Sequence, residues 1–145
     1  MKVNSEADLI TLGKKYGEKI FSHANLADGP IVIELLGDVG AGKPTFTRGL
    51  ATALRVTDTV TSPSFTISKT YAVKDEAGTP CTLTHYDFYR LNDPGIMVDD
   101  LAEHLAPFNI IVVEWGASVQ DFLPDPHHIV KITYTDDNSR EVTFL

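Results

Sequence analysis

The feature that most constrains the fold is a glycine-rich turn that directly follows an apolar run rich in β-branched residues. The apolar run, residues 31–36, predicts a buried strand. The turn, residues 37–43, has the pattern Gly-x-x-x-x-Gly-Lys, and a helix is expected over 44–54. A strand, a glycine-rich turn and a helix in this order form a phosphate-binding loop, or P-loop. The segment therefore predicts an α/β fold of the P-loop NTPase type.

The turn is suited to hold a phosphate group for physical reasons. Glycines permit positive φ angles and let the backbone approach an anion closely. Successive N–H groups and the positive end of the following helix would converge on the phosphate, and the ammonium group of Lys43 can reach the β- and γ-phosphates. The residues expected to bind the nucleotide here are Gly37, Asp38, Val39, Gly40, Ala41, Gly42, Lys43, Pro44 and Thr45.

One position departs from the P-loop pattern. The residue after the lysine should be Ser or Thr, whose hydroxyl binds Mg²⁺, and here it is Pro44. Proline removes that hydroxyl and a backbone donor, and it disfavours helical φ and ψ angles at Lys43, although a helix tolerates proline in its first turn. Thr45 is a candidate substitute ligand, but its side chain points about 100° further around the helix. We therefore expect phosphate binding with a weakened or absent Mg²⁺ site.

Composition limits the class of protein. The 145 residues fit one domain, 1–145, and the net charge of −8 argues against a chain that grips nucleic acid by itself. An acidic protein can still serve a nucleic-acid pathway by docking on a basic protein. Cys81 is the only cysteine, so an internal disulfide is excluded, and neither a signal peptide nor a membrane-spanning run is visible. A cytoplasmic protein without membrane contact is the expectation.

The remaining pattern predicts a mixed sheet flanked by helices. Helices are expected over 5–24 and, in pieces, over 93–105, and fully apolar residues predict a buried strand over 109–114. Alternating residues predict an antiparallel hairpin from 65–73 and 81–87. Two more alternating strands, 129–134 and 141–145, flank a polar turn at 136–139. The predicted sheet therefore contains both parallel and antiparallel strands.

Two acids close predicted strands. Glu114 ends the strand 109–114 and Asp87 ends the strand 81–87. Ligands of α/β sheets bind at the carboxyl ends of the strands, where an acid can hold a metal or orient an attacking water. The alternatives are a strand-ending surface acid for Glu114 and a capping residue in a buried turn for Asp87.

Other polar and aromatic residues allow two interpretations each. The hydroxyls of Ser62 and Ser64 could meet a γ-phosphate, or they belong to an ordinary Ser-Pro turn. Trp115 either packs beside its strand or lies against a nucleotide base. His127 and His128 are adjacent, so a strand would point them to opposite faces, which argues against a shared metal.

Four segments in the same order and spacing resemble the TsaE (YjeE) family of small bacterial P-loop ATPases. They are Gly-Asp-Val-Gly-Ala-Gly-Lys-Pro-Thr-Phe-Thr-Arg-Gly at 37–49, Ser-Pro-Ser-Phe-Thr at 62–66, His-Tyr-Asp-Phe-Tyr-Arg-Leu at 85–91 and Val-Glu-Trp-Gly at 113–116. The resemblance covers nearly the whole chain. It departs from the family at Pro44, where the family has Thr.

The resemblance implies roles for individual residues. The P-loop residues and Thr45 would hold ATP or ADP, with Lys43, Asp87 and Glu114 as the catalytic groups. Glu114, Asp87 and Thr45 would be the Mg²⁺ ligands, weakened or lost because of Pro44. Ser64 keeps the hydroxyl of the family's usual Thr, and Trp115 matches the family's tryptophan near the nucleotide.

The resemblance also implies a pathway and partners. TsaE proteins support the N6-threonylcarbamoyladenosine (t6A) modification of adenosine 37 of tRNA together with TsaB and TsaD, so contact with tRNA would be indirect. The leading hypothesis is an ATPase of this kind with turnover impaired by Pro44. The alternative is a non-hydrolysing nucleotide-binding scaffold of the same complex, and a small-molecule kinase ranks last because the chain shows no basic cluster for an acceptor.

Overall fold

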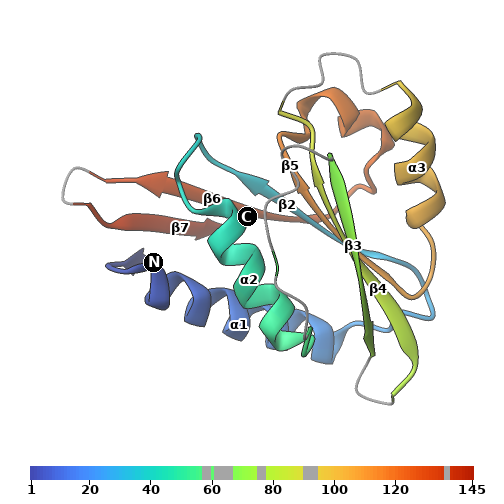
Figure 1. The fold of residues 1–145 in the computed structure, drawn as a ribbon, viewed down its shortest axis with the longest axis horizontal. Helices are drawn as coiled ribbons and strands as arrows, with labels where there is room; N and C mark the ends of the chain where they lie inside the picture. Colours follow the sequence, from blue (N-terminus) through green and yellow to red (C-terminus); the bar gives the residue numbers. More distant parts are fainter. Residues whose placement is uncertain (57–59, 61–66, 75–77, 90–94, 136–137) are drawn as a thin grey trace.

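The computed structural model describes residues 1–56, 60, 67–74, 78–89, 95–135 and 138–145. Its helices and strands follow the order of a P-loop protein, with a strand and a helix on either side of the glycine-rich turn (Figure 1). The elements are β1 (Lys2–Val3), α1 (Glu6–His23), β2 (Ile31–Leu36), α2 (Lys43–Ala53), β3 (Ser68–Lys74), β4 (Pro80–Asp87), α3 (Ile96–His104), β5 (Asn109–Glu114), the 3-10 helix η1 (Gly116–Phe122), β6 (His128–Tyr134) and β7 (Arg140–Phe144).

Within the described residues, the strands form one seven-stranded sheet in the order β1-β7-β6-β2-β5-β4-β3. The central strands β6, β2, β5 and β4 run parallel, while β3, β7 and β1 pair antiparallel at the two sides. The strand before the glycine-rich turn, β2, therefore lies in the middle of the sheet. This arrangement confirms the expected mixed α/β sheet, the hairpin of β3 and β4, and the antiparallel pair of β6 and β7.

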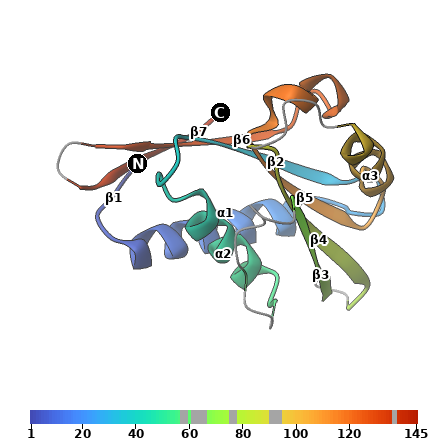
Figure 2. The ribbon, with the colours of Figure 1, turned by 45° about the horizontal axis from the view of Figure 1, so that its top comes forward.

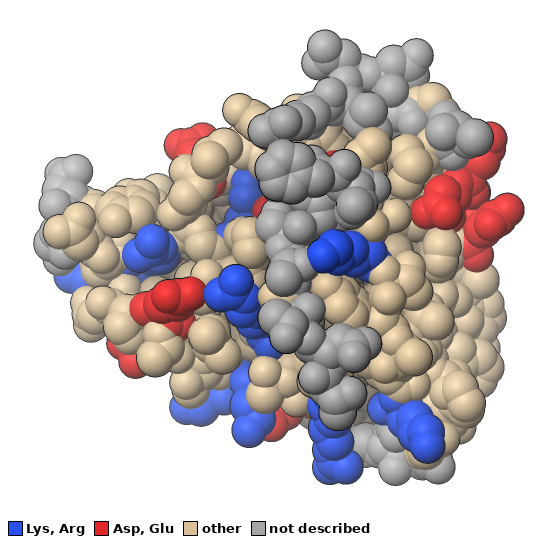
Figure 3. Space-filling view, in the orientation of Figure 1, with Lys and Arg blue, Asp and Glu red and all other residues tan. Residues whose placement is uncertain are grey.

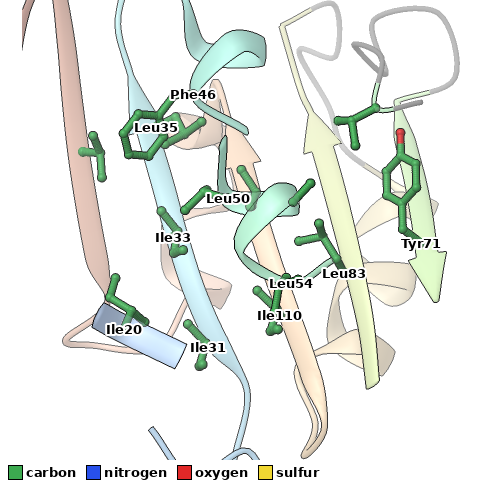
Figure 4. Close-up of a cluster of buried hydrophobic side chains, with 14 of the residues drawn as sticks. Ile20, Ile31, Ile33, Leu35, Phe46, Leu50, Leu54, Tyr71, Leu83 and Ile110 are labelled. Atoms are coloured by element: carbon green, nitrogen blue, oxygen red, sulfur yellow. The ribbon is translucent and has the colours of Figure 1, made fainter. Parts of the chain in front are cut away.

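The helices cover the two faces of the sheet unequally (Figure 2). Helices α1 and α2 lie together on one face, and α3 and η1 lie on the other. Figure 4 shows side chains from α2, such as Phe46 and Leu50, lying over Ile33 and Leu35 of β2. A second, smaller cluster, which includes Tyr86 and Leu101, fills the space under α3 and η1. Burial on both faces explains why β2 and β5 are nearly continuous apolar runs.

The helix after the glycine-rich turn begins one residue before its expected start. Pro44 disfavours helical angles at Lys43 but is tolerated in a first turn, and α2 begins at Lys43, with Gly42 as its N-cap. The preference that proline imposes on its predecessor is a bias, and at the first helical residue contacts of the side chain can override it. Lys43 is 3% exposed and has such contacts, which the next section describes.

Other expectations agree with the structure within a few residues. The helix expected over 5–24 is α1, and the strands expected over 31–36 and 109–114 have the observed bounds. The two-residue strand β1 and the helix η1 were not expected. None of the described helices is both long and apolar enough to cross a bilayer.

Candidate nucleotide-binding site

The backbone of the P-loop requires glycine for two different reasons. A Cβ atom on Gly37 would lie 2.5 Å from the carbonyl oxygen of Ile132 in β6, so the loop and β6 approach too closely for a side chain. Gly42 has a φ of 113°, and a Cβ atom there would also lie 2.6 Å from a methyl carbon of Leu9. The glycines of the sequence pattern therefore let the loop bend and pack closely against its neighbours.

Lys43 lies at the centre of the site. Its Nζ donates a hydrogen bond to the carbonyl oxygen of Gly37 at 2.5 Å and lies 3.8 Å from the centroid of the Trp115 ring. Burial lowers the pKa of Lys43, and the negative charges of Glu114, Asp87 and Asp38 act in the opposite direction. The lysine and the acids thus share one electrostatic environment, as expected for a site that binds a charged ligand.

The structure brings Asp87 and Glu114 together. They are paired in register at the carboxyl ends of the parallel strands β4 and β5, and both are buried. Asp87 accepts a hydrogen bond from the backbone N–H of Tyr89 at 2.9 Å, which caps the turn after β4. The capping interpretation of Asp87 is therefore confirmed, and its charge also acts on Lys43, while its role toward a metal or a water stays a prediction.

His85 is a member of the site that we did not single out from the sequence. Its Nε2 lies 2.5 Å from Oε2 of Glu114, and the ring is completely buried. A signal was present, because His85 precedes Asp87 by two residues and so lies on the same face of β4. The position of Glu114 beside it depends on strand order, which the sequence did not give in advance.

The residues proposed as metal ligands fit a nucleotide-bound Mg²⁺. Carboxylate and hydroxyl oxygens are suitable donors, and Mg²⁺ commonly uses one or two carboxylates together with phosphate oxygens. Asp87 and Glu114 supply the carboxylates, Thr45 lies in the first turn of α2, and Pro44 supplies no donor. In the described part of the chain, no group of three or more His, Cys, Asp or Glu side chains is placed to hold a metal ion.

Trp115 forms one wall of the site. It is the N-cap of η1, in a left-handed conformation with a φ of 56°. Its ring contacts both Lys43 and Tyr89, with the ring centroids of Trp115 and Tyr89 4.7 Å apart. The ring therefore does more than pack beside its strand. Its contact with a base stays a prediction.

A cavity of about 780 Å³ extends from the P-loop between η1 and β6. Its lining includes Gly37, Lys43, Trp115, Gln120, Lys131 and Tyr134. The last three come from η1 and β6, and the sequence pattern did not mark them. The cavity has room for a drug-sized ligand, whose sites commonly span about 300–1,000 Å³.

A buried polar network supports the side of this cavity. Glu34 of β2 accepts hydrogen bonds from Gln120 at 2.6 Å and, through its other oxygen, pairs with Nε2 of His127 at 2.9 Å. The neighbouring His128 contacts α1 instead, with its ring edge-on to Tyr16. The two histidines therefore face different elements, as the strand pattern predicted.

Two predicted residues, Ser62 and Ser64, fall in the segment 61–66, outside the described residues. Arg48 of α2 has partners outside the P-loop: its Nε donates to the carbonyl oxygen of Val60 and its guanidinium pairs with Glu6.

The sequence is similar to that of known proteins over most of its length. A family model described as threonylcarbamoyl adenosine biosynthesis protein TsaE matches residues 3–142. The tRNA threonylcarbamoyladenosine biosynthesis protein TsaE of Bacillus subtilis is 38% identical over 115 residues, which are 78% of this chain and 68% of that protein. The protein of the same name from Haemophilus influenzae is 31% identical over 137 residues, 93% of this chain and 82% of that protein.

The fold has a solved relative as well. A crystal structure of Bacillus subtilis YdiB superposes with a TM-score of 0.70 and 29% identity, covering 99% of this chain and 82% of that one. Sequence and structure thus agree over nearly the full length. This chain belongs to the TsaE family.

Proposed function

We propose that this protein binds ATP at the P-loop and acts in the biosynthesis of threonylcarbamoyladenosine in tRNA, as the names of its relatives say of them. The observation that carries the proposal is the position of Lys43, which lies between the P-loop backbone, Trp115 and the acids at the ends of β4 and β5. A buried ammonium group beside a glycine-rich turn is the arrangement that a triphosphate would use.

Each residue of the site has a role in this proposal. The N–H groups of the P-loop bind the phosphates, and Lys43 leaves the carbonyl oxygen of Gly37 to neutralise the charge that develops on the γ-phosphate. Asp87 orients the attacking water and accepts its proton. Glu114 and Asp87 would hold Mg²⁺, which neutralises phosphate charge when it is bound.

Pro44 should make hydrolysis slow. The missing backbone donor alone removes a hydrogen bond to a charged group, worth about 1.5–3 kcal/mol, or roughly 10- to 100-fold in affinity. The missing hydroxyl also removes one oxygen ligand of the metal. Nucleotide binding can survive these losses, because Lys43 and the other N–H groups remain.

Partner proteins would supply the contact with tRNA. On the face shown in Figure 3, acidic side chains gather over α3, and basic side chains lie scattered below and to the left of them. Helix α3 carries Asp99, Asp100 and Glu103. This mixture and the net charge of −8 favour docking on TsaB- and TsaD-like proteins over direct binding to tRNA.

The substitution Pro44→Thr tests the role of this position. We expect Mg²⁺-dependent phosphate release, measured with matching TsaB and TsaD proteins present, to rise at least about tenfold, because the variant regains a donor and a ligand. The variant Pro44→Thr with Lys43→Ala is the matched control and should lose this gain. Equal rates for the parent and for Pro44→Thr would refute the role assigned to position 44.

The same experiment separates the ATPase from a nucleotide-binding scaffold. A scaffold would show no phosphate release in any of these proteins, and Lys43→Ala would leave its capture by TsaB and TsaD unchanged. Calorimetric titration with ADP, with and without Mg²⁺, tests the more basic claim. An absence of heat and of thermal protection at millimolar ADP would refute nucleotide binding altogether.

A further inference from the structure

Arg140 of β7 contacts the P-loop, although 100 positions of the chain separate it from Gly40. Its Nε donates a hydrogen bond to the carbonyl oxygen of Ala41 at 2.7 Å, and a terminal nitrogen donates to that of Gly40 at 3.4 Å. Neither the P-loop pattern nor the four family motifs include Arg140. The contact nevertheless joins a guanidinium group to the two residues at the middle of the loop.

The hairpin of β6 and β7 holds the arginine in place. Tyr134 and Arg140 are paired in register, and the guanidinium carbon lies 4.5 Å from the centroid of the Tyr134 ring. A Cβ atom on Gly42 would lie 3.3 Å from Nε of Arg140, so the absence of a side chain at Gly42 leaves room for the arginine. A stacked, planar guanidinium is already oriented for its hydrogen bonds.

These contacts act on the direction of the backbone N–H groups. In a trans peptide the C=O of one residue and the N–H of the next point in opposite directions. When Arg140 holds the carbonyl groups of Gly40 and Ala41, the N–H groups of Ala41 and Gly42 point away from the arginine. The N–H of Ala41 donates across the turn to the carbonyl oxygen of Asp38 at 3.0 Å, which leaves the N–H of Gly42 to face a phosphate.

We infer that Arg140 is a positioning residue for phosphate binding: it fixes the peptide groups at the middle of the loop so that the N–H of Gly42 faces the nucleotide. The inference rests on the proposed nucleotide binding. It has particular weight in this chain, because Pro44 has already removed one donor of the loop. The positive charge of Arg140 adds a favourable potential close to the same phosphates.

The variants Arg140→Ala and Arg140→Lys test the inference, with calorimetric titration of ADP as the measurement. We expect Arg140→Ala to weaken ADP binding about tenfold, because the loop loses two hydrogen bonds and the N–H of Gly42 loses its fixed direction. Arg140→Lys keeps the charge and one donor but loses the planar pair, so its affinity should fall between those of Arg140→Ala and the parent. The melting temperature of the nucleotide-free protein should change little in Arg140→Lys.

Arg48→Ala is the matched control. Arg48 also donates from Nε to a backbone carbonyl oxygen, that of Val60, and its removal changes the net charge by the same amount. Its ADP affinity should stay within about twofold of the parent value, since the pair with Glu6 is exposed and weak.

A spectroscopic measurement separates positioning from general stability. In the nucleotide-free protein, the amide NMR signals of Ala41 and Gly42 should shift or broaden in Arg140→Ala, while signals of α1 stay in place. The inference is overturned if parent and Arg140→Ala bind ADP equally, or if the loss in affinity only follows a general loss of melting temperature. If the parent itself does not bind ADP, the proposed function fails instead.

Discussion

At the scale of single residues, His85 is the hydrogen-bond partner of the buried carboxylate of Glu114. Both side chains are almost completely shielded from water, and Nε2 of His85 lies 2.5 Å from Oε2 of Glu114. Among the described residues, Nδ1 of His85 is buried without a hydrogen-bond partner. A neutral imidazole that donates from Nε2 fits both facts, because it satisfies the carboxylate and leaves only a lone pair at Nδ1.

Removal of His85 should therefore destabilise the fold. The substitution His85→Leu leaves Glu114 buried without its donor, and we expect the free energy of unfolding to fall by about 1–3 kcal/mol. His85→Gln, which keeps an N–H donor, should lose less. Urea unfolding of these variants measures the effect.

A double-mutant cycle shows whether the loss belongs to the pair. In the background Glu114→Gln, the carboxylate is absent and His85→Leu should do less damage. Fully additive losses would mean that the two side chains do not act together.

At the scale of secondary structure, the crossing of α1 and α2 sets the position of the P-loop helix. A Cβ atom on Gly13 would lie 2.5 Å from the carbonyl oxygen of Phe46, and one on Gly49 would lie 2.3 Å from that of Ile10. The two helices therefore touch backbone to backbone. Since α2 begins at Lys43, this contact also fixes the height of the lysine above the sheet.

The substitution Gly49→Ala tests this contact. Alanine favours a helix over glycine by about 1 kcal/mol, but the added methyl group meets backbone atoms that cannot rotate away. We expect the overlap to dominate, with a net loss of about 1–3 kcal/mol in the free energy of unfolding. Thermal and urea unfolding measure it.

Gly29→Ala is the control for this experiment. A Cβ atom on Gly29 would meet nothing within 4 Å, so its stability should stay near that of the parent. Equal stability of Gly49→Ala and the parent would mean that separating the helices costs no more than the roughly 1 kcal/mol that alanine adds to the helix.

The elements of this fold were largely predictable, and the reasons are local. The run 31–36 and the run 109–114 are continuous and apolar, and the glycine-rich turn has a fixed pattern, so β2, β5 and the P-loop were expected. Lys43, Asp87 and Glu114 were expected for the same reason, and the structure brings them together. The helix η1 carries no comparable signal, because it is short and follows directly on a strand.

The rest of the site depends on contacts between distant segments. Arg140 contacts Ala41 only because β6 lies beside β2 and β7 lies beside β6. Glu34 contacts Gln120 and His127 only because η1 folds back over the sheet. Strand order and register decide such meetings, and neither is written in a local pattern. A glutamate inside an apolar strand was the one visible signal for Glu34.

At the scale of the whole molecule, Tyr16 joins helix α1 to strand β7 and to helix α2. Its ring is stacked on Phe144 of β7, with centroids 4.6 Å apart, and contacts Phe46 of α2. Burial raises the pKa of Tyr16 from the ordinary value of 10.0 to about 12. The folded protein therefore disfavours ionisation of this phenol more than the unfolded chain does.

This shift predicts a loss of stability at alkaline pH. Below pH 10 the phenol is neutral in both states and its contribution is fully present. As the pH rises from 10.0 to about 12, only the unfolded chain loses the proton, so the free energy of unfolding falls by up to about 3 kcal/mol. Burial also raises the pKa of Tyr86, which adds to the fall in the same direction.

Urea unfolding at pH 8 and pH 11 checks the prediction, with Tyr16→Phe as the control. The variant keeps the ring and cannot ionise, so it should lose less stability between the two pH values than the parent. An equal loss in both proteins would contradict the pKa assigned to Tyr16.

The position of β2 in the middle of the sheet has a consequence for biosynthesis. Its partners β5 and β6 begin at Asn109 and His128, and the arginine that supports the loop is residue 140. At about 5–20 residues per second, a ribosome needs several seconds to make the intervening stretch, and during that time the backbone hydrogen-bonding edges of β2 have no native neighbour. The strand that leads into the P-loop can therefore take its place in the sheet only after residue 134, the end of β6, has been made.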